Sequence, residues 1–153
     1  MFGNSFSQHA RAAVFLLLTA TAQTNALGIN CRGSGLCDFF LNTAISGNEA
    51  KVLSDWIQGI SAEGYTPPVM AQNRMYKNGE QIACYIRSSI CAFVQNAPGD
   101  TSLADIRRLA PEIPGHKCKV CGSVPTGYPG NNDVKHGQLT FNYVKHSCGN
   151  GIC

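Results

Sequence analysis

The sequence predicts an α+β fold: one mostly antiparallel sheet with two helices on one face. Two observations predict this class. Five short strand-like stretches and two stretches of helical periodicity follow one another as strand, helix, strand, strand, helix, strand, strand. In addition, the 153-residue chain carries eight cysteines, all after residue 30, which is typical of a small domain stapled by disulfides.

Residues 1–26 are predicted to be a signal peptide. Arg11 precedes an apolar run over residues 12–20, which is too short to span a bilayer. Thr24 and Ala26 supply the small side chains that precede a cleavage site. A buried helix of a cytosolic protein is the alternative. Cleavage after Ala26 leaves one domain, residues 27–153, and predicts a secreted, extracellular protein without a later membrane anchor.

The charge of the mature chain is small. Without Arg11, 11 of the 12 Lys and Arg residues remain against 9 Asp and Glu, a net charge of +2. This balance is too weak to predict binding to nucleic acid or to an anionic membrane. We therefore expect no nucleic-acid partner and no stable membrane insertion.

The first helix is predicted over residues 46–63. Leu53, Trp56, Ile57 and Ile60 recur on one helical face, Ser46 or Asn48 can cap its start, and Gly64 can end it. The second helix is predicted over residues 101–109, where Ser102 with Asp105 resembles a capping box. Pro111 and Pro114 are expected to stop it.

The strands are predicted over residues 27–37 (a brief strand running into a loop), 81–87, 90–95, 117–123 and 138–144. Ser88 and Ser89 form the turn between the second and third of these strands. In the last strand Leu139, Phe141 and Tyr143 alternate with more polar residues. The tail from residue 149 is expected to be flexible, apart from its final cysteine.

The eight cysteines are expected to form structural disulfides. In an extended chain Cys118 and Cys121 lie about 10 Å apart, beyond the ~7 Å limit for a bond, so each must pair elsewhere. A redox pair is disfavoured because the residues that follow cannot form a helix. A zinc site with His116, His136 or His146 is the other alternative. The cysteines are Cys31, Cys37, Cys84, Cys91, Cys118, Cys121, Cys148 and Cys153.

Three blocks of sequence resemble the killer-toxin family of the virally encoded smut-fungus toxin (killer protein four) and its fungal and moss relatives. The blocks are residues 27–34 with Cys37, residues 118–123, and residues 132–144 with Cys148; residues 92–95 add a weaker match. The resemblance implies an α/β sandwich: a five-stranded antiparallel sheet packed on two antiparallel helices. Little resemblance is found over residues 38–80.

The resemblance also implies three disulfides: Cys31–Cys118, Cys37–Cys121 and Cys84–Cys148. Elimination then leaves Cys91–Cys153. The first two bridges close loops of over 80 residues, on the order of 4 kcal/mol each. A tight hairpin centred between Arg87 and Ser88 would instead place Cys84 opposite Cys91, so the rival pairing is Cys84–Cys91 with Cys148–Cys153.

The function implied by the resemblance is inhibition of calcium uptake in fungal or plant cells through block of a calcium channel. The partner is then a calcium channel or another membrane protein, and we expect a monomer without cofactor, metal or catalytic residues. The family's basic run before the cysteine matching Cys84 is replaced here by Gln81, Ile82 and Ala83. The leading target-binding candidates are therefore Lys77 and Arg87, followed by Arg74, Lys117 and Lys119.

Two other functions are open from the sequence. A small secreted ribonuclease or hydrolase would need a histidine, His116, His136 or His146, beside Asp133, Glu112 or Glu80, and the spacing does not predict such a group. A virulence effector or binding protein could act on a plant host without touching a channel.

Overall fold

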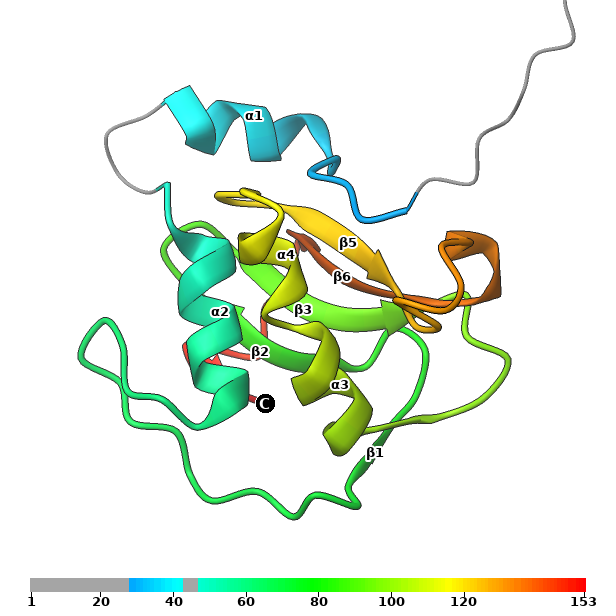
Figure 1. Ribbon diagram of the computed structural model, residues 1–153. Coiled ribbons are helices and arrows are strands. Elements are labelled where there is room, and N and C mark those ends of the chain that lie inside the picture. Colours follow the sequence, from blue (N-terminus) through cyan, green and yellow to red (C-terminus); the bar gives the residue numbers. More distant parts are fainter. Residues whose placement is uncertain (1–27, 43–46) are drawn as a thin grey trace, which may run out of the picture.

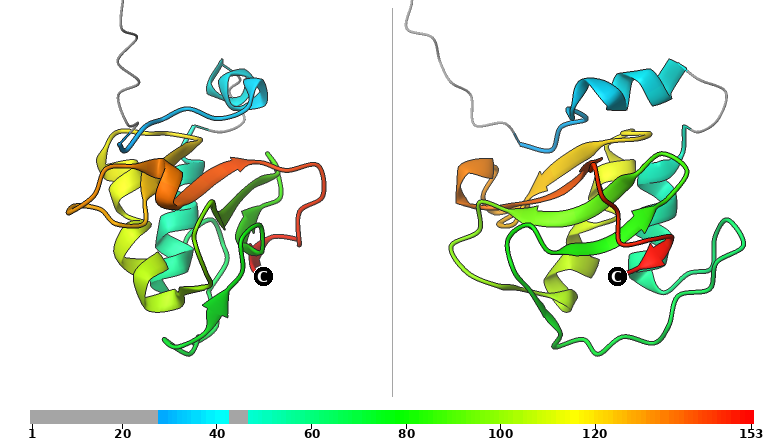
Figure 2. Two further views of the ribbon diagram at one scale, coloured as in Figure 1. Left: turned by 90° about the vertical axis from the view of Figure 1, so that its right-hand side faces the viewer. Right: turned by 180° about the vertical axis from the view of Figure 1, so that it is seen from behind.

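A five-stranded antiparallel sheet with helices on one face forms the body of this protein. The structure is a computed structural model that describes residues 28–42 and 47–153, except for the side chains of residues 40–42. The strand order is β5-β6-β3-β2-β7. Helices α2, α3 and α4 cover one face, and α2 runs opposite to α3 and α4 (Figure 1). The view from behind shows the opposite face without a helical layer (Figure 2). This confirms the predicted class. The predicted signal peptide lies outside the described residues.

The centre of the sheet is the pair β3 (Ile90–Gln95) and β6 (Gln138–Tyr143), which face each other from Ile90 opposite Tyr143 to Gln95 opposite Gln138. On one side β6 pairs with β5 (Gly122–Pro125), and on the other side β3 pairs with β2 (Gln81–Tyr85). The bounds of β3 agree with the prediction, whereas β2 ends two residues earlier and β5 begins later than expected. A separate small sheet pairs β1 (Met75–Tyr76) with β4 (Thr101–Ser102).

Helix α2 (Glu49–Gln58) is shorter than predicted. Gly59 adopts a left-handed conformation, with φ of 84°, and its N–H bonds back to the Asp55 and Trp56 carbonyls. The helix therefore ends at Gln58, six residues before Gly64. Leu53, Trp56 and Ile57 are fully buried as predicted, but Ile60 lies beyond the helix and is 54% exposed, so its assignment to the buried face was wrong.

Helix α3 (Leu103–Leu109) begins after Ser102, whose hydroxyl oxygen accepts a hydrogen bond from the Asp105 N–H at 3.1 Å. The predicted cap is confirmed, although Thr101 and Ser102 themselves belong to β4. A further turn, α4 (Glu112–Gly115), follows directly after Pro111. Helix α3 ends at Leu109 as predicted, and Pro111 then starts a new turn, because a proline at the start of a helix loses no intrahelical hydrogen bond.

The start of the mature domain differs most from the prediction. The brief strand expected within residues 27–37 is reduced, in the described residues, to a bridge of Asn30 to Ser123 with backbone hydrogen bonds of 3.0 and 2.8 Å. Helix α1 (Gly35–Asn42) then lies outside the main helical layer, above the loop that precedes β5 (Figure 1). A Cβ on Gly33 would meet the Cys37 sulfur at 2.3 Å, so this close approach of chain and disulfide requires a glycine.

The C-terminal tail is also more ordered than expected. Strand β7 (Gly151–Ile152) pairs with β2 at the edge of the sheet. The Ile152 N–H donates to the Tyr65 hydroxyl at 3.0 Å, and a Cβ on Gly151 would meet the Tyr65 ring at 2.2 Å. The absence of a side chain at Gly151 therefore lets the tail lie against Tyr65.

Candidate functional site

Two disulfides join the start of the mature domain to the loop before β5, and we refer to this region as the clasp. The bonds are Cys31–Cys118 and Cys37–Cys121, with Cα–Cα distances of 5.0 and 5.8 Å. They confirm the two pairings implied by the family resemblance. Because Cys118 and Cys121 are both oxidised, neither is a thiolate that could bind zinc.

Hydrogen bonds fix the clasp loop to the helices beneath it. The Cys118 N–H donates to the Ile113 carbonyl at 3.3 Å, and the Lys119 carbonyl accepts from the Ala50 N–H at 3.0 Å. Lys117 adopts a left-handed conformation with φ of 68°. The loop is thus held by covalent bonds from one side and by α2 and α4 from the other, so its side chains project from a rigid backbone.

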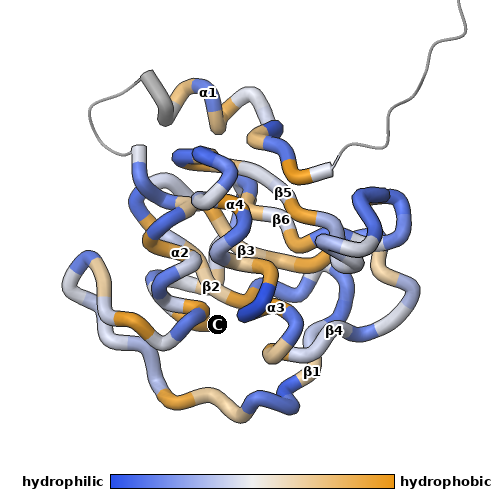
Figure 3. Tube along the Cα trace, viewed as in Figure 1, coloured by the Kyte–Doolittle hydropathy of each residue, from blue (hydrophilic) through white to orange (hydrophobic). Residues whose placement is uncertain are grey.

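Three cations surround the clasp. Arg32 follows Cys31, and Lys117 and Lys119 flank Cys118, so a single disulfide brings the three positions together. All three residues are exposed, and within the described residues none of them forms a salt bridge. The loop between α4 and β5 alternates hydrophilic and apolar positions in Figure 3, and its two lysines are exposed while Cys118 and Val120 are buried. The clasp therefore presents three exposed cations around one disulfide.

The other predicted cations are dispersed. Lys77 and Arg87 lie beyond opposite ends of β2, a strand roughly 17 Å long. Arg74 is engaged within the fold: its guanidinium lies 3.8 Å from Glu80 and 4.5 Å from the centre of the Tyr76 ring. The two leading candidates are exposed, but they do not form one contact site.

Arg87 borders a hollow that also contains acidic groups. Glu49, Glu63 and Tyr85 line the same hollow, and the Tyr85 hydroxyl donates to Glu63 at 3.5 Å. Burial and the nearby Glu63 carboxylate raise the pKa of Tyr85, while Arg87 acts in the opposite direction. The charge of Arg87 is therefore partly balanced by its surroundings, unlike the charges at the clasp.

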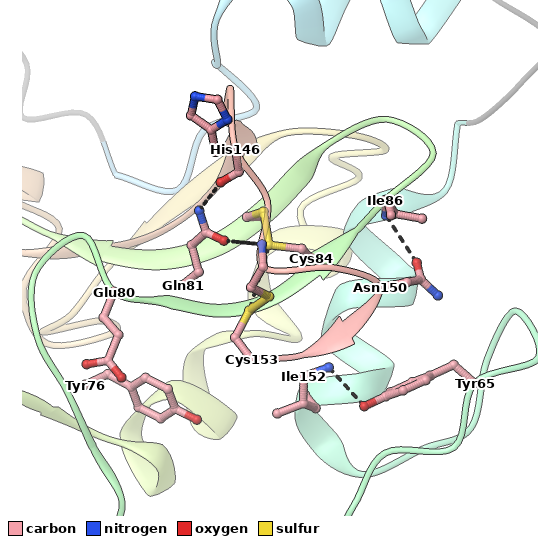
Figure 4. The surroundings of a disulfide bond; sticks show 12 residues. Tyr65, Tyr76, Glu80, Gln81, Cys84, Ile86, His146, Asn150, Ile152 and Cys153 are labelled. Atoms are coloured by element: carbon pink, nitrogen blue, oxygen red, sulfur yellow. Dashed lines mark hydrogen bonds between the residues drawn. A yellow bond between two sulfur atoms is a disulfide. The ribbon is translucent and has the colours of Figure 1, made fainter.

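The remaining four cysteines pair locally. The structure contains Cys84–Cys91 and Cys148–Cys153, so the expected pairs Cys84–Cys148 and Cys91–Cys153 were wrong and the rival pairing is confirmed. The cause is the register of the β2–β3 hairpin, which sets Cys84 directly opposite Cys91 with their Cα atoms 4.1 Å apart. The two local bonds lie next to each other, the first across β2 and β3 and the second within the C-terminal tail (Figure 4).

The segment that precedes Cys84 has a structural role. Ile82 and Ala83 are fully buried. Gln81 connects two parts of the tail, because its amide donates to the His146 carbonyl at 2.7 Å and its oxygen accepts from the Cys148 N–H at 2.7 Å (Figure 4). The place where the family resemblance puts basic residues is thus occupied here by core and by tail contacts.

One histidine does meet a carboxylate, contrary to the prediction from spacing. His136 Nδ1 lies 3.1 Å from Asp133, which caps a short 3-10 helix, η1 (Val134–His136). The hydrogen bond from the Lys135 N–H, followed by the nearby charge of His136, lowers the pKa of Asp133. The His136 side chain is 74% exposed. This geometry is that of a helix cap.

In the described residues, no helix is both long enough and apolar enough to cross a membrane.

Comparison with known proteins agrees with this architecture. The model of the Kp4 family matches residues 14–145. The chain is also 36% identical, over 141 residues, to the KP4 killer toxin of Ustilago maydis P4 virus, an alignment that covers 88% of this chain and 95% of the toxin. A match of this extent, on a fold with the expected sheet and clasp, shows that the chain belongs to the Kp4 family of killer toxins.

Proposed function

We propose that this protein is a secreted killer toxin that lowers calcium uptake in target fungal or plant cells by blocking a calcium channel, and that the clasp is the surface that contacts the channel. Membership of the Kp4 family supports the killer-toxin part of this proposal. The observation that carries the assignment of the surface is the group of three exposed cations around Cys31–Cys118, none of which forms a salt bridge in the part of the chain that the structure describes.

The clasp has the physical properties that pore block requires. A cation channel concentrates cations by rings of carboxylates, and a lysine or arginine fixed on a protein too large to permeate can occupy such a ring. Lys117 and Lys119 flank a cysteine whose disulfide fixes the backbone, so little backbone entropy is lost when they bind. The same argument does not hold for Arg74, which already contacts Glu80 and Tyr76.

The test is calcium influx into fungal cells and plant root cells exposed to the purified protein. Lys117→Gln with Lys119→Gln should abolish most of the inhibition. Lys135→Gln with Lys145→Gln is the matched control, because it removes the same charge from two other exposed lysines and should leave inhibition unchanged. Lys77→Gln with Arg87→Gln tests the site favoured by the sequence.

The possible outcomes separate the hypotheses. If the clasp variant kept full activity while the Lys77 and Arg87 variant lost it, the clasp would not be the surface that contacts the channel. Lys77 and Arg87, the leading candidates from the sequence, would then be the contact residues. Growth inhibition or a plant response without any change in influx would contradict channel block and favour an effector. Loss of activity on replacement of His136 would support an enzyme instead.

A further inference from the structure

The two local disulfides bring their sulfur atoms into contact. Cys84 Sγ lies 3.9 Å from Cys153 Sγ, and the sulfurs of Cys84, Cys148 and Cys153 are all within 4.8 Å of one another. The tail is held in this position by the Cys153 N–H, which donates to the Ile82 carbonyl at 2.9 Å, and by the bonds of Gln81 (Figure 4). The contact between the two disulfides is therefore a fixed feature of the fold.

The two bonds differ sharply in accessibility. Cys84 and Cys91 are fully buried, whereas Cys148 and Cys153 are exposed. A thiolate in solution must approach a sulfur atom to exchange with it. It can reach the tail bond but not the hairpin bond.

We propose that the Cys148–Cys153 bond is a reaction site for a low-molecular-weight thiol, and that the sulfur it frees transfers the exchange to the buried Cys84–Cys91 bond. The incoming thiolate attacks Cys148 Sγ and forms a mixed disulfide, while the electron pair of the broken bond leaves on Cys153. The Cys153 thiolate attacks Cys84 Sγ and forms Cys84–Cys153. The electron pair of the second broken bond leaves on Cys91, which takes a proton from water.

The reaction consumes one thiol and needs no oxidant or reductant besides it. One bond inside the protein is replaced by a mixed disulfide, and one free thiol appears at Cys91. Attack on Cys153 instead would free Cys148, which is also within 4.8 Å of Cys84. Either route ends with Cys84 joined to the tail, because the neighbouring sulfur is already in place and acts at a high effective concentration.

Tryptic mapping tests the proposal on the unaltered protein. Trypsin cleaves after Lys77, Arg87, Arg107 and Lys145, so the hairpin bond joins peptides 78–87 and 88–107, while the tail bond lies within peptide 146–153. The protein is treated with reduced glutathione, and free thiols are then trapped with N-ethylmaleimide in guanidinium at mildly acidic pH, which opens the fold so that buried Cys91 can react while further exchange is slow. We expect peptide 78–87 to move from peptide 88–107 to a glutathionylated peptide 146–153, with the maleimide on Cys91.

Three results would overturn the proposal. The first is a maleimide on Cys148 or Cys153 with the hairpin bond intact, and the second is an absence of any reaction with glutathione. The third is a link between peptides 78–87 and 146–153 before any thiol is added, because the hairpin bond would then not exist in the resting protein.

A variant shows whether the tail is required. In Cys148→Ser with Cys153→Ser, the hairpin bond keeps its burial but loses the adjacent sulfurs. We expect glutathione to open Cys84–Cys91 at least about tenfold more slowly in this variant than in the unaltered protein. An equal rate would mean that external thiols reach the hairpin bond directly, and it would contradict the relay.

Discussion

Removal of the two clasp disulfides should destabilise the protein by more than the sum of the separate removals. Each bridge on its own closes a long loop, with sequence separations of 87 and 84. The chain-entropy estimate for a loop of that length is about 4.6 kcal/mol. The two loops interleave and overlap over residues 37–118, however, so the second bridge to form closes only the short segments 31–37 and 118–121.

The short segments set the cost of losing a single bridge. They contain six and three residue steps, or about nine in all, and a loop of that size corresponds to about 2.6 kcal/mol. Replacing either cysteine pair by alanine should therefore cost about 2.6 kcal/mol, while replacing both should cost about 7 kcal/mol. The double removal therefore costs about 2 kcal/mol more than the sum of the two single removals. The loss of a single bridge is accordingly smaller than the value of about 4 kcal/mol expected for each bridge taken alone.

Guanidinium unfolding of the three variants measures these values, and both cysteines of a bridge are replaced so that no free thiol remains. The tail bond Cys148–Cys153 provides the control, because its loop shares no residues with the loops that the two clasp bridges close. Its removal should add to the loss of either clasp bridge within about 0.5 kcal/mol. The reasoning from overlapping loops would be refuted if the loss in the double variant equalled the sum of the two single losses. It would also be refuted if a single bridge cost more than about 4 kcal/mol.

Two further predictions concern local interactions. Ser102→Ala removes the cap of α3 and should lower the free energy of unfolding by about 1 kcal/mol, measured by chemical denaturation, with the neighbouring Thr101→Ala as the smaller-effect control. Burial raises the pKa of Tyr76 and of Tyr85, so the folded state keeps protons that the unfolded state loses above about pH 10. The contribution of these two groups to the free energy of unfolding should be complete below about pH 10 and should fall as the pH rises further. In Tyr85→Phe this fall should be less steep. If the fall were equally steep in that variant, the raised pKa of Tyr85 would not contribute to it.

The sequence predicted those elements whose periodicity reflects burial. The β3 and β6 strands and the face of Leu53, Trp56 and Ile57 agree with the structure because alternation and helical spacing follow from packing against one core. The start of the domain could not be predicted in the same way. Helix α1 is tethered to the sheet by Cys37–Cys121 and lies outside the helical layer, so no core-facing period marks it.

The disulfides show where a resemblance succeeds and where local geometry decides. The clasp cysteines lie in blocks that match the family, and their pairing was predicted correctly. The pairing of Cys84 was transferred from the family too, and elimination then produced a second wrong bond. Hairpin geometry gave the right answer, because a turn centred between Arg87 and Ser88 sets Cys84 opposite Cys91 whatever the relatives do.

The same reasoning predicts that a basic residue cannot simply be restored before Cys84. In Gln81→Lys the ammonium cannot accept the hydrogen bond from the Cys148 N–H, so we expect a loss of about 1 kcal/mol and roughly tenfold faster hydrogen exchange at that amide. Gln81→Glu is the matched control, because its carboxylate keeps the acceptor and should keep the amide protected. If Gln81→Lys retained full protection, Gln81 would not anchor the tail. Position 81 could then carry a cation without loss of stability. The segment before Cys84 would be as suitable for contact with a channel as the clasp.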